Sequence, residues 1–361
     1  MMPSNTPFET PVGLTTSPRL SIIITNYNYA KFVASAIDSV LSQNEAVELI
    51  VVDDYSTDNS RDVIGEYADR VITVFQEVNR GHGAGFNAGF ARATAELIMF
   101  LDADDCLLPG AIRTILSNYE PDVAIYHYRM RYMDEAGALS GIHPSPAIPL
   151  ADGDISGQLR SAGRYQGTIT SGLVFSRQHL AHVMPMDPEA FRQGGDGYLS
   201  AVVPLYGPSR AYETLISGYR LHGSQHSRFS SAYAKRSRWC IAHDAERYRA
   251  IREHSNRLGL PVAADLGADD PDNIHERLIS MLFAPDEHPV QGDSIKELAH
   301  RSARNEKAHA AGVRLLFAYV FWGLFGILPG SGKQRLMSWK IDAKSRPAWM
   351  RHLAKRLRSG G

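Results

Sequence analysis

Cysteine is scarce in this sequence: only Cys106 and Cys240 occur among 361 residues. Two isolated cysteines form neither a disulfide framework nor the paired spacing of a zinc site, which indicates a reducing compartment. Long apolar runs are missing as well. The most apolar stretch, residues 313–328, has 16 residues and contains Arg314, whereas a membrane-spanning helix needs ~20 apolar residues. No internal repeat is found.

Net charge is close to zero, at −1, but it is unevenly distributed. Residues 331–361 contain nine Lys or Arg and a single acid, Asp342, which gives +8, so the remaining 330 residues carry −9. An acidic body of this kind disfavours a nucleic-acid partner, whereas the basic end suits an anionic membrane surface.

The chain is long enough for one large α/β domain and a smaller extension. Residues 1–18, rich in Pro, Thr and Ser, lack the basic start and apolar core of a signal peptide and are expected to form a disordered leader. The sequence changes character near Phe229, so we predict one domain over 19–230 and a helical extension over 231–361. Together with the cysteine content, this organisation indicates a cytoplasmic protein.

Four short apolar runs, rich in β-branched residues, predict buried strands. Helical patterns lie between them, and the resulting β-α-β-α-β-α-β order predicts an α/β fold with a parallel sheet covered by helices on both faces. The predicted strands span residues 20–25, 49–52, 71–75 and 97–101, and the predicted helices include 60–68, 88–95, 232–258, 273–283, 293–309 and 313–328.

Three carboxylates, Asp102, Asp104 and Asp105, directly follow the fourth predicted strand. Carboxylates this close repel one another and raise each other's pKa. A divalent cation removes that cost, and short acidic side chains suit Mg²⁺ or Mn²⁺, which also bridge substrate phosphates. The carboxyl end of a strand is where ligands bind in an open α/β sheet. A solvated acidic turn that caps the next helix is the structural alternative.

A glycine-rich loop over residues 79–87 follows the third predicted strand. With Ala88, Gly83 and Gly85 fit the pattern G-x-G-x-x-A, which makes an NAD-dependent oxidoreductase an alternative. Three features oppose it. Residues 76–82 separate the glycines from the strand, an earlier β-α-β unit already ends in a pair of aspartates, and a ribose hydroxyl needs one carboxylate rather than three.

Five segments, in the order in which they occur, resemble the family 2 inverting glycosyltransferases. The resemblance covers about residues 20–110 and returns at Gly194–Leu199 and Tyr219–Ser224. It implies the GT-A fold, a nucleotide-diphosphate sugar as donor, and Mn²⁺ or Mg²⁺ as cofactor. The five segments are Thr25-Asn26-Tyr27-Asn28, Val52-Asp53-Asp54-Tyr55-Ser56-Thr57-Asp58, Asn79-x-Gly81, Asn87-x-Gly89 and Leu101-Asp102-Ala103-Asp104-Asp105.

The resemblance also implies where the nucleotide binds. Thr25 and Tyr27 match positions that border the base, and Asp54 matches the residue that accepts a hydrogen bond from the base N3–H. That contact favours uracil or thymine, so a UDP- or dTDP-sugar is expected. The glycine loop is expected to lie against the nucleotide, because glycines let a backbone approach a ligand closely, with Asn87 as a hydrogen-bonding partner. Phe86 stands where many relatives have Arg, which removes a cationic contact to the donor.

The remaining matched positions concern the metal and the reaction. The resemblance implies that Asp102 faces the ribose and metal, that Asp104 ligates the metal, and that Asp105 contacts the donor sugar or caps the next helix. His222, in Tyr-Arg-Leu-His-Gly-Ser, matches a histidine that closes over the diphosphate or adds a metal ligand, which favours Mn²⁺. Asp196 partly matches the general base of an inverting transfer, with a glycine in place of the usual acidic neighbour. A loop aspartate that caps a helix is the structural alternative for Asp196.

We therefore predict an inverting, metal-dependent glycosyltransferase that moves a sugar from its donor to a hydroxyl of a glycan or glycolipid acceptor, in bacterial surface polysaccharide or glycolipid assembly. A scaffold, or a protein that binds sugar nucleotides without catalysis, is the alternative. Two interpretations of residues 313–328 stay open: a buried helix, or an in-plane helix at a membrane interface. The second places residues 312–361 in peripheral contact with the inner face of the cell membrane.

Overall fold

The computed structural model describes residues 19–223, 233–310, 312–342, 345–348 and 350. The predicted leader over residues 1–18 lies outside the described residues. The chain divides into two compact units, the first made of Met1–His222 with Glu246–Ala264 and the second of Gly223–Ala245 with Asp265–Gly361. The sequence predicts a single break near residue 230, whereas segment 246–264 returns to the first unit.

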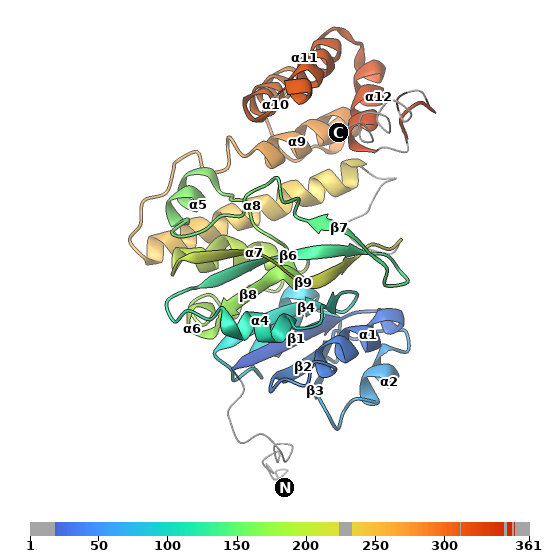
Figure 1. The fold of residues 1–361 in the computed structure, drawn as a ribbon. Coiled ribbons are helices and arrows are strands. Elements are labelled where there is room, and N and C mark those ends of the chain that lie inside the picture. Colours follow the sequence, from blue (N-terminus) through green and yellow to red (C-terminus); the bar gives the residue numbers. More distant parts are fainter. Residues whose placement is uncertain (1–18, 224–232, 311, 343–344, 349, 351–361) are drawn as a thin grey trace. The chain divides into compact units, whose positions relative to one another are not determined.

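The first unit is built on one mixed sheet, in the order β3-β2-β1-β4-β8-β6-β9-β5, with β7 paired to β6 (Figure 1). Its first four strands run parallel, as the sequence predicts, and β8 then pairs antiparallel with β4. The strands are β1 (Leu20–Asn26), β2 (Glu48–Asp53), β3 (Ile72–Phe75), β4 (Leu97–Asp102), β5 (Cys106–Leu107), β6 (Ile125–Met133), β7 (Leu139–His143), β8 (Leu173–Ser176) and β9 (Ser209–Arg220).

Helices cover both faces of the parallel strands. Ile22 and Ile24 of β1 share a buried apolar cluster with Val33 and Ile37 of α1, whereas Ile23 points to the opposite face. The helices of this unit are α1 (Ala30–Leu41), α2 (Ser60–Gly65), α3 (His82–Phe90), α4 (Ala111–Ser117), α5 (Ser156–Ala162), α6 (Arg177–Leu180) and α7 (Gly195–Val202), with short 3₁₀ turns at Thr170–Gly172 and Val203–Leu205.

Helix α3 begins earlier than the sequence predicts. A loop was expected up to residue 87 and a helix over 88–95, but the helix starts at His82, inside the glycine-rich segment. Tertiary packing overrides the low helix propensity of glycine here. A Cβ atom on Gly89 would lie 2.3 Å from Ile23 Cγ2, so only glycine lets α3 pack this closely on β1.

Segment 246–264 belongs to the first unit because the second half of helix α8 (Tyr233–Arg257) packs there. Arg247 is buried and donates hydrogen bonds to the carbonyl oxygens of Gly197 and Gly163, each at 3.2 Å. His254 lies between two tyrosines, with Nε2 3.0 Å from the Tyr198 hydroxyl and Nδ1 2.7 Å from the Tyr206 hydroxyl. These buried contacts hold the helix that contains Asp196.

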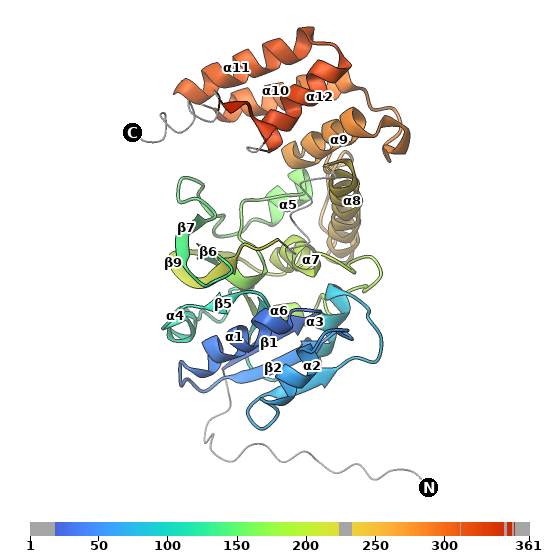
Figure 2. The same ribbon diagram turned by 90° about the vertical axis from the view of Figure 1, so that its right-hand side faces the viewer.

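The second unit is helical and has a core of its own (Figure 2). The side-chain oxygens of Asp270 and Ser294 accept backbone N–H groups at the N-termini of α9 and α10. No helix within the described residues is long and apolar enough to cross a membrane. Besides the start of α8, this unit contains α9 (Pro271–Phe283), a 3₁₀ turn at Pro285–Glu287, α10 (Ile295–His309), α11 (Gly312–Ile327) and α12 (Gly330–Ile341).

Candidate active site

The carboxyl ends of β1, β2 and β4 meet at one edge of the sheet. Thr25 is paired in register with Asp102 on one side and with Val52 on the other, and Asn26 is paired with Asp53. The polar residues that follow these strands are therefore neighbours in space, as their positions in the sequence predict.

Three carboxylates form a compact cluster where β4 ends. One ligand atom from each of Asp102, Asp104 and Asp105 lies within 4.8 Å of the other two, and Asp104 and Asp105 are buried. Asp105 Oδ1 accepts a hydrogen bond from the Arg220 backbone N–H at 2.8 Å, while its Oδ2 is buried without a hydrogen-bond partner among the described residues. Burial, together with the charges of Asp104 and Asp102, raises the pKa of Asp105 well above its usual value.

His222 completes one side of this cluster. Its Nε2 lies 2.8 Å from Asp104 Oδ2, and its ring packs edge-on against Tyr29 and at a tilt against Phe32. Burial and the charge of Asp104 raise the pKa of the Tyr29 hydroxyl, which places that hydroxyl beside the same carboxylates. The structure therefore places His222 at the acidic cluster, and its role as a metal ligand stays a prediction.

His82 is a member of the site that the sequence analysis did not single out. Its Nε2 lies 3.5 Å from Asp102 Oδ1, and its ring packs edge-on against Phe86. Burial lowers the pKa of His82, but the hydrogen bond and charge of Asp102, with the charges of Asp196 and Asp104, outweigh burial and raise it. The sequence gives no signal for this position, because it predicts a loop here, whereas in the structure His82 is the first residue of α3.

Asp196 lies in the first turn of α7, partly exposed. The pKa values of His82 and Asp102 depend mainly on burial and on the interaction between these two residues. The negative charge of Asp196 makes a smaller contribution and raises both pKa values. The backbone also places Asp196 near this group: a Cβ atom on the preceding Gly195 would lie 3.2 Å from Phe86, whose ring packs against His82. The role of Asp196 as a base stays a prediction.

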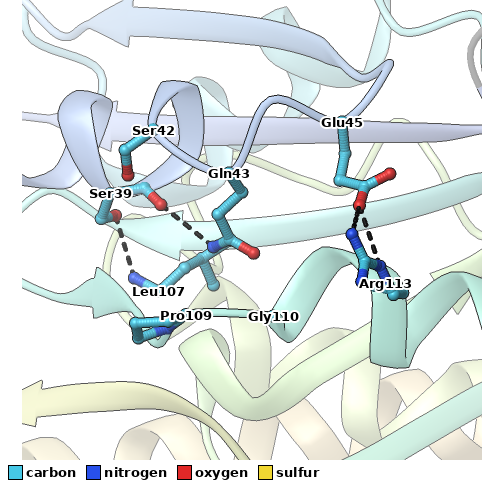
Figure 3. Close-up of a pocket in the computed structure, with 8 residues that line it drawn as sticks. All are labelled: Ser39, Ser42, Gln43, Glu45, Leu107, Pro109, Gly110 and Arg113. Carbon is cyan, nitrogen blue, oxygen red and sulfur yellow. Dashed lines mark hydrogen bonds and ion pairs between the residues drawn. The ribbon is translucent and has the colours of Figure 1, made fainter.

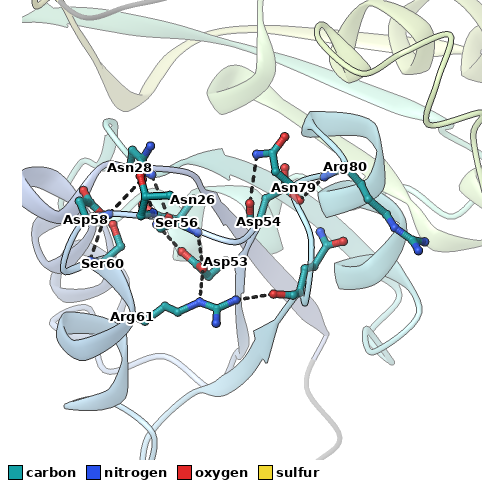
Figure 4. A network of polar contacts seen from close by, with 12 residues as sticks. Asn26, Asn28, Asp53, Asp54, Ser56, Asp58, Ser60, Arg61, Asn79 and Arg80 are labelled. Carbon is teal, nitrogen blue, oxygen red and sulfur yellow. Dashed lines mark hydrogen bonds and ion pairs between the residues drawn. The ribbon is translucent and has the colours of Figure 1, made fainter.

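Asp53 and Asp54, where β2 ends, hold the surrounding loops together (Figure 4). Asp53 is fully buried and accepts hydrogen bonds from Asn26 Nδ2, from the Ser56 backbone N–H and from Arg61 Nε, at 2.9 to 3.0 Å. Asp54 accepts the backbone N–H groups of Arg80 and Gly81 at 2.8 and 2.6 Å. Burial raises the pKa of Asp54. The carboxylate predicted to contact the nucleotide base therefore also holds the glycine-rich loop in place.

The glycines of this loop are required by another segment of the protein. A Cβ atom on Gly81, whose φ is +87°, would lie 2.3 Å from the Arg192 carbonyl oxygen, and one on Gly83 would lie 2.7 Å from that of Phe191. The His82 and Gly83 N–H groups donate to these two carbonyls. The sequence predicts that these glycines allow close approach of a nucleotide, whereas in the structure the close approach is to the backbone of residues 191–192.

Asn87 has a similar structural contact. Its Nδ2 donates to the Met186 carbonyl at 2.8 Å and its Oδ1 accepts the Met186 N–H at 2.9 Å. Both ends of the amide thus hold the segment that leads to α7, and the contact of Asn87 with the nucleotide stays a prediction. Phe86 is fully buried and stacks on Phe100 with ring centroids 3.9 Å apart. The sequence position that lacks the expected Arg therefore belongs to the core.

Thr25 and Tyr27 lie at the same edge of the sheet. Thr25 is partly exposed at the end of β1, with its side chain against Gly85 of α3, and Tyr27 is 38% exposed just after the strand. An exposed ring beside the strand ends is available to a planar ligand. The assignment of both residues to the nucleotide base stays a prediction.

A pocket of about 420 Å³ lies elsewhere, between the C-terminal end of α1 and the start of α4 (Figure 3). Arg113 and Glu45 form an exposed ion pair at its rim, at 2.9 Å. It is lined by none of the residues predicted to bind donor or metal, so we do not assign it to the site.

Comparison with known proteins identifies the family. Residues 21–169 match the family described as Glycosyl transferase family 2. An uncharacterized glycosyltransferase of Nostoc sp. (strain PCC 7120) is 32% identical over 255 residues, which is 69% of this chain and 79% of that protein. This chain belongs to glycosyltransferase family 2. The glycosyltransferase has the α/β fold of the GT-A type that the sequence predicts, with a helical C-terminal extension.

Other similarities cover less of the sequence or are weaker. The Escherichia coli protein named UDP-Glc:alpha-D-GlcNAc-diphosphoundecaprenol beta-1,3-glucosyltransferase is 30% identical over 129 residues, which is 35% of this chain and 51% of that protein. Among solved structures, the Pyrobaculum calidifontis mannosyltransferase in complex with GDP-Man and Mn²⁺ has a TM-score of 0.49 at 15% identity, covering 91% of this chain and 87% of that one. Staphylococcus aureus TarS in complex with UDP-GlcNAc has a TM-score of 0.45 at 14% identity, covering 85% and 91%.

Proposed function

We propose that this glycosyltransferase is an inverting, metal-dependent enzyme that transfers a sugar from a nucleotide-diphosphate donor to an acceptor hydroxyl. The observation that carries the proposal is the cluster of Asp102, Asp104 and Asp105, of which the last two are buried, with His222 on one side and Asp196 nearby. We further propose a UDP- or dTDP-sugar as the donor, because Asp54 matches the position that favours uracil or thymine.

The cluster is suited to a divalent cation. Asp105 Oδ2 is buried without a partner among the described residues, and burial together with the neighbouring carboxylates raises the pKa of Asp105. A group of hard oxygen ligands with excess negative charge fits Mg²⁺ or Mn²⁺, and an imidazole ligand from His222 favours Mn²⁺. Asp102, Asp104 and His222 are the residues we assign to it. When bound, such a cation neutralises the charge that builds on the leaving diphosphate.

The chain's own residues supply the other parts of the reaction. Inversion needs one general base, which takes the proton of the acceptor hydroxyl as that oxygen attacks the anomeric carbon from the face opposite the diphosphate. We assign this role to Asp196. The Arg247 hydrogen bond to the Gly197 carbonyl and the Asn87 clamp on Met186 hold the segments on either side of Asp196. We assign Asp105 and Thr25 to binding of the sugar donor, and Tyr27 to contact with the nucleotide base of that donor.

The names of relatives support the acceptor class. One is a succinoglycan biosynthesis protein of Rhizobium meliloti, 33% identical over 157 residues, and the Escherichia coli relative is named for a diphosphoundecaprenol-linked acceptor. Both matches cover well under half of this chain. We propose that the acceptor is a glycan or glycolipid of a bacterial surface polysaccharide pathway and that the protein contacts the inner face of the cell membrane.

Calorimetric titration of nucleotide sugars, with and without Mn²⁺, tests this function. We expect one UDP- or dTDP-sugar to bind only with the cation, and Asp196→Asn to keep that binding while the transfer rate falls by ~10²–10⁴. Asp187→Asn, which alters an exposed turn before α7, is the matched control and should transfer at the normal rate. Near-normal turnover of Asp196→Asn would remove this residue from the mechanism. Donor binding without turnover in the unaltered protein would favour a sugar-nucleotide-binding protein.

A further inference from the structure

Helix α11 has two apolar faces, and only one of them is covered. Ala318, Trp322 and Phe325 are buried in the core of the second unit. Each residue turns a helix by about 100°, which places a second row of aliphatic side chains on the opposite side. This row, which we call the outer stripe of α11, consists of Leu316, Val320, Leu324 and Ile327, exposed by 64%, 52%, 44% and 81%.

The outer stripe is concentrated rather than scattered. Six of the fifteen large apolar side chains that are exposed in the described residues lie on this one helix of 16 residues, the other two being Phe317 and Tyr319. Single exposed apolar residues are ordinary on a soluble domain, but a contiguous row marks a surface that contacts something apolar. The sequence leaves a buried helix and an interfacial helix as alternatives, and α11 has one buried face and one exposed apolar face.

The charges around α11 point to the nature of that contact. Residues 312–361 carry Arg314 and the nine basic residues counted above against Asp342, which gives +9. Arg314 and Arg335 are exposed in the structure. An apolar stripe accompanied by excess positive charge fits an anionic lipid surface. The apolar side chains would enter the acyl region, and the basic side chains would pair with the lipid phosphate groups. A helix of 16 residues spans about 24 Å, less than the ~30 Å hydrocarbon core, so it fits the interface plane.

We propose that the outer stripe of α11 docks on an anionic bilayer, with the helix axis parallel to the membrane plane and the exposed Arg314 and Arg335 on the lipid phosphates. The proposal rests on the membrane contact included in the proposed function and specifies the residues that make it. It requires no contribution from the acidic cluster.

Co-sedimentation of the full-length chain with vesicles tests the docking. Binding is expected to vesicles of equal parts phosphatidylglycerol and phosphatidylcholine, and to weaken in high salt, where the basic residues are screened. The double variant Val320→Asp/Leu324→Asp should bind at least ~10-fold more weakly, because two aliphatic side chains no longer enter the acyl region. The matched control is Ile148→Asp, at a 41% exposed position in the first unit, which should bind normally.

Charge reversal separates the two parts of the contact. Arg314→Glu/Arg335→Glu should weaken binding to the phosphatidylglycerol vesicles by about fivefold or more per residue and leave any binding to pure phosphatidylcholine unchanged. Circular dichroism of each variant confirms that the helices are retained. Equal binding of the unaltered protein and Val320→Asp/Leu324→Asp would overturn the proposal.

Two further measurements distinguish other outcomes. If the unaltered protein ignores vesicles but forms a dimer that Val320→Asp/Leu324→Asp dissociates, the outer stripe is an interface between two copies and the proposal is wrong. Donor turnover in solution, measured on the same preparations, should be equal in the unaltered protein and the docking variants. Docking without any turnover would contradict the proposed transfer reaction alone. Turnover with no docking would contradict this proposal and the membrane contact on which it rests, and would leave the proposed reaction intact.

Discussion

Two groups of aspartates lie at the same edge of the sheet, and the protein treats them differently. Where β2 ends, Asp53 is paired with the Arg61 guanidinium, and both Asp53 and Asp54 accept hydrogen bonds at each carboxylate oxygen. Where β4 ends, no Lys or Arg side chain in the described part of the chain forms an ion pair with Asp102, Asp104 or Asp105. Among the described residues, His82 and His222 are the basic side chains within 3.5 Å of these carboxylate oxygens, and Asp105 Oδ2 is buried without a hydrogen-bond partner.

This difference is the one expected if the first group has a structural role and the second group has the proposed role in cation binding. Carboxylates that are fully hydrogen-bonded stabilise the loops they join, whereas carboxylates that repel one another in a buried place cost stability unless a cation arrives. Replacing Asp by Asn should therefore lower the stability of the protein in the first group and raise it in the second, and unfolding experiments can measure this difference.

The largest effect is expected for Asp104→Asn. Loss of this carboxylate should remove the cation-dependent part of donor binding and lower kcat/KM by ~10³-fold, since a metal contributes several kcal/mol of charge stabilisation at the leaving group. Transfer rates at increasing Mn²⁺ concentration measure it. Asp69→Asn, at an 81% exposed side chain, is the control and should leave the rates unchanged. Unaltered kcat/KM in Asp104→Asn would contradict the assignment.

Asp53→Asn should mainly affect stability. The neutral amide loses the Arg61 ion pair and cannot accept all three hydrogen bonds, which should cost about 2 kcal/mol of unfolding free energy. Arg61 is more than a third exposed, so solvent weakens the ion pair and the cost stays moderate. Urea unfolding monitored by circular dichroism tests this prediction, and an unchanged midpoint would show that the network contributes little.

Asp105→Asn should raise the stability of the protein, in contrast to Asp53→Asn. Because burial and its neighbours raise the pKa of Asp105, its contribution to stability is present below the unfolded pKa of about 3.9 and is lost as the pH rises toward the folded pKa. Without divalent cations at pH 7, the Asn variant should melt at a higher temperature, and the difference should shrink below pH 4. A lower melting temperature at pH 7 would show that the carboxylate is structural.

Three histidines extend the comparison to the dependence of the unfolding free energy on pH. His82 and His222 face carboxylates, whereas burial with no acidic partner lowers the pKa of His127 to about 3. A depressed histidine keeps its full contribution to stability above the unfolded pKa of about 6.5 and loses it as the pH falls, at about 1.4 kcal/mol per pH unit. The unfolding free energy of His127→Asn should therefore fall less steeply between pH 6 and 4. Parallel slopes in both proteins would contradict this explanation.

Local patterns in the sequence predict the edge of the site well. The buried apolar runs predict the parallel strands. The residues that follow these strands lie together because parallel strands end at one edge of the sheet. His222 could be placed beside Asp104 only through the resemblance to relatives, since 118 residues separate the two.

Contacts between distant segments were less predictable. The glycine-rich segment suggests a bound ligand, but the carbonyl groups of residues 191–192 lie where side chains on Gly81 and Gly83 would be. Nothing local in the sequence indicates that Arg247 and His254 pack on the helix of Asp196 rather than on their own extension. Such pairings depend on how well two surfaces fit, which residue periodicity does not encode.

Electron paramagnetic resonance of Mn²⁺ tests the central claim most directly. Titration of the ion into the protein, with and without UDP, should reveal one site that the nucleotide diphosphate tightens, that Asp104→Asn abolishes and that Asp69→Asn retains. Equal Mn²⁺ binding by the unaltered protein and Asp104→Asn would contradict the assignment of the β4 carboxylates to a cation.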